Sequence, residues 1–434
     1  MMPGRHPEPS ASHRRAGCPD SIESCDATGP RRRDWLLAFA AALVLADAFD
    51  AVLYAACGRD ATVLPGLPVS RVLLLTVFAA AAILLAGDRR GTLDHLRAAW
   101  PLWPVLALAF ASAAWSEQPR TTLLWAVALL GTSAFGLALA VRFSPRSQSG
   151  LTTAVITSIA LASVVTALLW PAFGISPRGE LHGLYVHKNL LGKLMALGAA
   201  SAGVAAASGW RRPLALAALL LFGGVIVFAQ SRASLLVAVI VVAAALLLLA
   251  ARRWRRHAAA ILAGGAAVTI LAVAFLVATK PGLSLVARSE TFSDRTRIWR
   301  VVGAAALETP WLGHGYGAFW PSPAGQNALA LIRIPINQAH NGALDLAAEL
   351  GLAGLVLVLA PLAYFAVAAL RHGLDAKVRA CLWPGTYFVF LIASNTAESG
   401  LLRHKLFWAL YVASASHVAR QRAARAGTRG ARAG

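Results

Sequence analysis

The sequence is poor in charged residues. Only 14% of its 434 residues are Asp, Glu, Lys or Arg, whereas 58% are hydrophobic. Soluble domains carry about 25% charged residues, so this composition excludes an ordinary soluble enzyme. It also excludes disorder over most of the length, because disordered chains combine low hydrophobicity with high net charge.

Cysteine is also scarce. The four cysteines form no CxxC pair and show no regular spacing; they are Cys18, Cys25, Cys57 and Cys381. The pattern indicates neither a disulfide framework nor a zinc site.

Long apolar runs are what the chain has in abundance. A helix needs about 20 apolar residues to cross a bilayer core of about 30 Å. Runs near this length predict about twelve transmembrane helices, at 35–57, 70–87, 100–116, 121–141, 151–173, 190–208, 213–229, 233–250, 258–279, 342–370, 381–395 and 404–418. The chain is therefore expected to be an all-α integral membrane protein with a polytopic transmembrane domain over 35–418.

Basic residues set the expected orientation. The formal net charge is +21, and the Lys and Arg residues stand in short clusters between apolar runs, as at 251–257. Polytopic membrane proteins keep such clusters on the cytoplasmic side, so nucleic acid is not an expected partner. Residues 1–34 are predicted to be a disordered basic cytoplasmic tail, and 419–434 a second basic tail. Both termini are then cytoplasmic.

One loop on the opposite face stands out by its length. Residues 280–341 form a predicted external loop of about 60 residues, and long loops without a span of their own are usually functional. The loop contains the glycine-rich run 310–317, in which glycine permits tight turns, and it ends at His340-Asn341.

Cationic and imidazole side chains gather in the loops of this outer face. Arginine forks bind phosphate oxygens in pairs, and lysine adds a point charge. Histidine can accept a proton from a hydroxyl nucleophile at neutral pH. The set therefore suits a phosphate-bearing substrate, and it comprises His187, Lys188, Arg232, Arg295 and His340, together with the acidic Glu398.

The order of these motifs resembles the O-antigen ligase and polymerase superfamily of bacterial membrane proteins. The matching pieces are Ser231-Arg232, Arg295 with Trp299, Pro310-Trp311-Leu312-Gly313 with Gly315 and Gly317, His340-Asn341, and Glu349-Leu350-Gly351. Two further pieces are more similar to the exopolysaccharide-polymerase branch, namely His187-Lys188-Asn189 with Gly192, and Asn395 with Thr396, Glu398 and Ser399. The family-like core covers about residues 180–412.

This resemblance implies a membrane glycosyltransferase with a GT-C-like helix bundle in the bacterial cytoplasmic (inner) membrane. Such an enzyme moves a glycan from an undecaprenyl-pyrophosphate carrier to an acceptor sugar hydroxyl on the outer side, with inversion and without metal or other cofactor. Surface or exopolysaccharide biosynthesis is the implied process. The implied partners are the lipid bilayer, the lipid-linked glycan, the acceptor glycan, and flippase and chain-length regulator proteins.

The resemblance also implies roles for single residues. Arg232 and Arg295 are expected to hold the pyrophosphate, and His340 to orient or deprotonate the acceptor hydroxyl. The expected substrate-binding residues are His187, Lys188, Asn189, Arg297, Asn341 and Glu398. Asp294 stands where members often have glycine, so either Arg295 or Arg297 is the functional loop arginine.

Other interpretations stay open beside these. Glu398 is alternatively an ion-pair partner of Arg403. Asp345 and Glu349 are four residues apart and share one face of a predicted helix, where interhelical hydrogen bonds are expected. A ligase that passes a finished glycan to a lipid or protein acceptor is an alternative to a polymerase. A polysaccharide-lipid transporter is a third alternative, although no internal repeat supports it.

Overall fold

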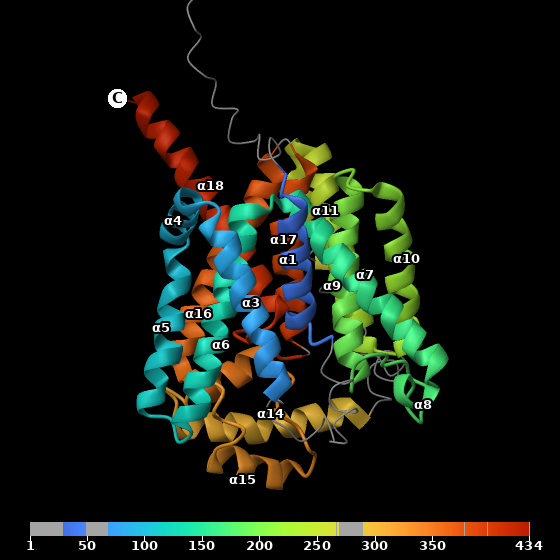
Figure 1. Ribbon diagram of the computed structural model, residues 1–434, viewed down its shortest axis with the longest axis vertical. Helices are drawn as coiled ribbons and strands as arrows, with labels where there is room; N and C mark the ends of the chain where they lie inside the picture. Colours follow the sequence, from blue (N-terminus) through green and yellow to red (C-terminus); the bar gives the residue numbers. More distant parts are fainter. Residues whose placement is uncertain are drawn as a thin grey trace, which may run out of the picture.

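The computed structural model describes residues 29–48, 68–265, 267–268, 290–376, 378–396 and 398–433. The regular elements in these residues are helices, and one antiparallel bridge joins Ile175 and Leu181. Most helices run side by side and form a bundle (Figure 1). The predicted all-α architecture is therefore confirmed for the described part of the chain.

Six helices within the described ranges are long and apolar enough to span a membrane: α6 (Pro119–Arg142), α7 (Pro145–Leu169), α9 (Lys188–Ala207), α10 (Arg212–Ala229), α11 (Arg232–Arg253) and α16 (Gly342–Asp375). α3 (Pro68–Ala86) and α4 (Arg89–Ala98) follow each other with a bend of 107° between them. The count becomes seven if these two helices form one span. The expected count of about twelve is not confirmed.

Several predicted spans are shorter helices in the structure. α1 (Arg32–Leu45) and α17 (Leu382–Asn395) have 14 residues each, which at about 1.5 Å per residue is less than the bilayer core. The run 100–116 is divided into η2 (Trp100–Leu102), α5 (Trp103–Ala111) and η3 (Ser112–Ala114). Residues 49–57 of the first predicted span and 269–279 of the ninth lie outside the described residues.

α17 occupies the centre of the bundle. Almost all of its side chains are buried, and Trp383, Tyr387 and Phe390 are fully buried. It packs against α9, α11, α16 and α18 (Leu406–Ala433). The segment that follows α17 is therefore held close to the ends of α9 and α16.

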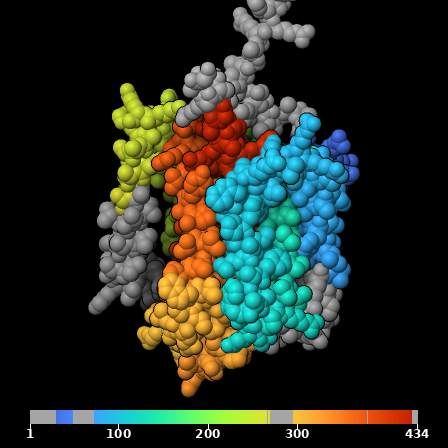
Figure 2. Space-filling view, turned by 90° about the vertical axis from the view of Figure 1, so that its left-hand side faces the viewer, coloured from blue at the N-terminus to red at the C-terminus, as the bar shows by residue number. Residues whose placement is uncertain are grey.

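The outer helices present apolar side chains outward. Leu220 on α10, Leu246 on α11 and Val356 on α16 are each more than half exposed. Figure 2 shows α16 at the surface beside the segment α4 to α6. Exposed apolar faces of this extent need a covering, and a bilayer supplies one for a multi-pass membrane protein.

Two helices lie across one end of the bundle (Figure 1). α14 (Glu290–Glu308) and α15 (Pro323–Ile332) belong to the segment predicted as the long loop 280–341. They share a small core of their own, in which Ile298 and Val302 of α14 pack with Ile332 of α15. The segment is thus built on helices, and its position outside the membrane stays a prediction.

Helix α16 is broken at Gly351, and the glycine-rich turn 310–317 fills the break. Gly351 has φ 59° and ψ −157°, a conformation that L-residues with side chains rarely adopt. Freed backbone groups need new partners. The N–H of Leu352 donates to the Pro310 carbonyl at 2.8 Å, and the N–H of Gly315 donates to the Glu349 carbonyl at 2.8 Å.

Part of the basic cluster 251–257 has a structural role. Arg252 donates from Nη1 to the Gly373 carbonyl at 2.7 Å, and Arg255 donates from Nη2 to the Leu374 carbonyl at 2.9 Å. These are carbonyls of the last turn of α16, which have no partner inside the helix. Two arginines predicted as orientation signals therefore also cap α16.

Candidate functional site

Glu398 collects hydrogen bonds from three other segments of the chain. Its Oε1 accepts from Asn189 Nδ2 at 3.2 Å and lies 3.3 Å from Arg295 Nη2. Its Oε2 accepts from Gln338 Nε2 at 2.9 Å and lies 3.0 Å from His340 Nδ1. Both oxygens of this buried carboxylate are thus fully engaged.

The surroundings of Glu398 keep it negatively charged. Burial by itself would raise the pKa of this carboxyl group. The hydrogen bond from His340 and the electrostatic attraction of His340, Lys193 and Arg295 outweigh burial and lower the pKa to about 2. Glu398 is therefore an anion at any physiological pH, and the cations around it outnumber it.

His340 presents one ring nitrogen to this carboxylate and leaves the other available. A carboxylate only accepts hydrogen bonds, so Nδ1 carries the proton toward Glu398, and Nε2 of the neutral ring is an acceptor. No hydrogen-bond partner of Nε2 is found in the described part of the chain. The side chain as a whole is 19% exposed.

Glu398 and its partners Asn189, Arg295, Gln338 and His340 form a cluster of polar side chains. Arg295 belongs to α14, and Trp299 lies on the same helix. They are four positions apart and therefore share one face of the helix. Arg295 contacts Glu398, while Trp299 donates from Nε1 to the Ala339 carbonyl at 2.9 Å. Arg297 points elsewhere, because its Nη2 donates to the Leu331 carbonyl at the end of α15 at 2.6 Å. Of the two candidate loop arginines, the structure brings Arg295 to the cluster.

The start of α9 supplies one more direct contact. Asn189 bonds to Glu398 and accepts from Ser231 Oγ at 3.0 Å. His187 precedes α9 and accepts from the N–H of Asn189 at 3.3 Å, so it caps this helix. Lys188 instead pairs with Glu180 at 2.5 Å. The predicted trio His187, Lys188 and Asn189 therefore divides into a cap, an ion-pair partner and a cluster member.

Arg232 and Asn341 each begin a helix. Arg232 is exposed at the start of α11, directly after Ser231, which is buried and bonded to Asn189. Asn341 is the N-cap of α16, where its Oδ1 accepts from the N–H groups of Ala343 and Leu344 at 3.1 and 3.2 Å. In the structure Asn341 thus has a capping contact.

The alternative pairing of Glu398 with Arg403 is not the one formed. Arg403 lies 2.8 Å from Oε1 of Glu349 and 3.7 Å from Oδ2 of Asp345. The expectation that Asp345 and Glu349 bond between elements agrees with these contacts. Arg403 thus joins the segment after α17 to α16.

Two members of the cluster were not anticipated from the sequence. Gln338 stands two residues before His340, and both side chains contact the carboxylate of Glu398. Lys193 is buried in α9, where its Nζ donates to the Ser399 carbonyl at 3.4 Å and lies 4.6 Å from the centre of the Phe407 ring. A lysine inside an apolar helix is costly, and this signal could have marked Lys193 as a candidate.

The composition of the cluster favours an anionic ligand over a cation. It holds one carboxylate together with two basic side chains, Arg295 and Lys193. The described residues contain no group of three or more His, Cys, Asp or Glu that could hold a metal ion. The arrangement offers cations for a phosphate group and an imidazole acceptor for a proton.

Comparison with known proteins agrees with the motif order. The model of the family described as O-antigen ligase matches residues 217–359, which include Arg232, Arg295, His340 and the Gly351 break. No curated protein matches the chain. The family match supports a glycan-transfer function of ligase or polymerase type at a membrane, and residues 217–359 are similar to the O-antigen ligase family.

Proposed function

We propose that the protein is a metal-independent, inverting glycosyltransferase of the cytoplasmic membrane that acts on its outer side. Its donor is a glycan on undecaprenyl pyrophosphate, and its acceptor is a sugar hydroxyl. The observation that carries this proposal is the His340–Glu398 pair, in which Nδ1 of the imidazole contacts the carboxylate that also binds the buried Arg295.

The proposed step is a direct displacement. The acceptor hydroxyl oxygen forms a bond to the anomeric carbon of the donor sugar, and the bond from that carbon to the pyrophosphate oxygen breaks. The proton of the hydroxyl passes to Nε2 of His340. The leaving pyrophosphate takes the bonding electrons, and Arg295 and Arg232 stabilise the charge that develops on it.

Glu398 acts through His340 in this scheme. It fixes the ring orientation and the tautomer, and it stabilises the imidazolium that forms, as the carboxylate does in a Ser-His-Asp triad. The apolar outer faces of the bundle give the polyprenyl chain a lateral approach, so the glycan stays in water while the lipid stays in the bilayer.

A polymerase is favoured over a ligase by one contact. The two pieces similar to the exopolysaccharide-polymerase branch, at 187–189 and 395–399, meet through the Asn189–Glu398 hydrogen bond. Polymerisation would place the protein beside a flippase that delivers lipid-linked repeat units and a regulator of chain length. A ligase that attaches a finished glycan to a lipid or protein acceptor is the second candidate function.

Reconstituted transfer tests the proposal. Purified protein in lipid nanodiscs is incubated with a polyprenyl-pyrophosphate oligosaccharide and a chelator, and product length is followed by mass spectrometry. We expect ladders of joined units, and loss of product in His340→Ala. Asp34→Asn, which alters a buried carboxylate paired with Arg142 on a different part of the bundle, serves as the control. A requirement for a nucleotide sugar would contradict the proposal.

A further inference from the structure

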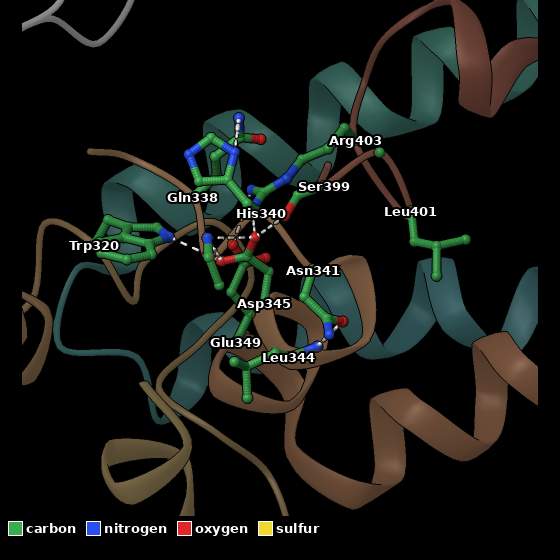
Figure 3. A network of polar contacts seen from close by, with 12 residues as sticks. Trp320, Gln338, His340, Asn341, Leu344, Asp345, Glu349, Ser399, Leu401 and Arg403 are labelled. Carbon is green, nitrogen blue, oxygen red and sulfur yellow. Dashed lines mark hydrogen bonds and ion pairs between the residues drawn. The ribbon is translucent and has the colours of Figure 1, made fainter. Parts of the chain in front are cut away.

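Asp345 lies between the two segments that carry His340 and Glu398. Its carboxylate accepts from the N–H of Ala339 at 3.1 and 3.0 Å, through Oδ1 and Oδ2. Its Oδ2 also accepts a hydrogen bond from Ser399 Oγ. Ala339 directly precedes His340, and Ser399 directly follows Glu398. Figure 3 shows Asp345 at the centre of this network.

The backbone at His340 needs such an anchor. His340 has φ 53°, in the left-handed region, which a residue with a side chain rarely adopts and keeps only when its surroundings fix it. Ala339 is held on both sides, by Asp345 at its N–H and by Trp299 at its carbonyl. On the other side of His340, Asn341 is fixed as the cap of α16.

Asp345 is itself held rigidly. It is 3% exposed and accepts from Trp320 Nε1 at 3.0 Å. Arg403 lies 3.7 Å from its Oδ2 and bridges to Glu349. Asp345 sits in the first turn of α16, so its position follows that of the helix. Each of its carboxylate oxygens is occupied by protein donors, which leaves it no free acceptor for a substrate.

We propose that Asp345 is a positioning residue that sets His340 opposite Glu398. The inference rests on the proposed function for its effect on turnover, and on the network alone for its effect on geometry. Asp345 links the backbone of Ala339, which precedes His340, to the side chain of Ser399, which follows Glu398. Removing these ties lets the left-handed turn at His340 relax, and the Nδ1 bond to Glu398 is then lost.

Three variants separate hydrogen bonding from charge and from folding. Asp345→Ala removes every tie. Asp345→Asn keeps an acceptor for Ala339 and Trp320 and can donate to Ser399, so it preserves most of the geometry without the charge. Ser399→Ala removes only the tie to the Glu398 segment and leaves α16 intact. Asp34→Ala is the matched control, because it removes a buried carboxylate that lies 2.7 Å from Arg142.

Two readouts are compared in nanodisc-embedded full-length protein. The first is the transfer rate with a polyprenyl-pyrophosphate oligosaccharide, separated into kcat and KM. The second is the ¹⁵N spectrum of histidine-labelled protein, in which His340 is assigned by comparison with His340→Gln. For Asp345→Ala we expect kcat to fall by about 10²-fold, in the range of lost acid–base catalysis. The donor KM should change little, and the Nδ1–H tautomer of His340 should give way to a mixture.

The outcomes are distinct. The kcat of Asp345→Asn should stay within about tenfold of the wild-type value, a smaller loss than that of missing proton transfer. The kcat of Ser399→Ala should lie between those of Asp345→Asn and Asp345→Ala. A wild-type His340 spectrum in Asp345→Ala overturns the inference, whatever the rate. If Asp345→Ala does not fold, an unchanged spectrum and kcat in Ser399→Ala overturn it instead. If wild type is inactive while the His340 spectrum still changes in Asp345→Ala, the proposed function fails and the positioning role stands.

Discussion

Nδ1 of His340 lies 3.0 Å from Oε2 of Glu398, across 58 positions of sequence. One partner precedes α16 and the other follows α17, so the tertiary fold brings them together. The pair joins a proton acceptor to an anion that fixes its tautomer. Arg295, from a third element, closes the same cluster.

Replacing His340 tests the base directly. We expect His340→Gln to lower kcat by about 10²–10⁴-fold, because proton transfer by a positioned side chain contributes that much. The donor KM should stay near its wild-type value, since the pyrophosphate is assigned to arginines. Steady-state transfer assays measure both values. A variant that raises KM alone would assign His340 to donor binding instead.

The two loop arginines should differ. Arg295→Ala removes a charge from the cluster and leaves Glu398 with one donor fewer, so we expect about a 10²-fold loss of kcat, as for other electrostatic groups at a leaving oxyanion. Arg297→Ala removes only a bond to the Leu331 carbonyl, and its loss should be far smaller. Parallel transfer assays on the two variants compare them, and equal losses would contradict the assignment.

Glu398 should make stability depend on acid pH. Its pKa is lowered in the folded protein to about 2 from an ordinary 4.5. A lowered folded-state pKa adds stability above the unfolded-state value, and this stability is lost as pH falls from about 4.5 toward 2. Thermal unfolding in nanodiscs, for wild type and Glu398→Gln, measures the effect. The Tm of wild type should fall more steeply over that window than the Tm of Glu398→Gln, and parallel curves would contradict the ion pairing.

The break in α16 should not tolerate a side chain. Gly351 has a positive φ, and an added Cβ would overlap the backbone of Trp311 and Leu312. We expect Gly351→Ala to destabilise the protein by at least about 1–3 kcal/mol, the cost of forcing a residue into this conformation. Gly223 is the control, because it lies within helix α10 and its Cβ would meet no atom within 4 Å. Gly223→Ala should raise the Tm slightly through helix propensity.

Apolar run length predicted the helical class, whereas its count of about twelve spans is not confirmed by the described residues. Hydropathy identified the long helices α6, α7, α9, α10, α11 and α16 because each is continuous and apolar. Its other runs form shorter helices where prolines divide a run, as in α5, or where a short helix such as α17 is buried by its neighbours. Burial inside a bundle and burial in a bilayer leave the same pattern of apolar residues.

The order of motifs predicted which residues to examine but could not predict their partners. Asn189, Arg295, His340 and Glu398 meet as a group, as expected from one outer face. Whether Glu398 pairs with Arg295 or Arg403 depends on how α14 lies across the bundle, which no local pattern encodes. The sequence predicted hydrogen bonds for Asp345 but not its partners Ala339 and Ser399, because these lie outside its helix.

The junction between the turn 310–317 and α16 is formed by main-chain atoms. Pro310 and Gly315 engage the helix through carbonyl and amide groups, while the side chain of Trp311 is 69% exposed. Because these contacts use main-chain atoms, the exposed side chains of the turn can be substituted without loss of its hydrogen bonds to α16.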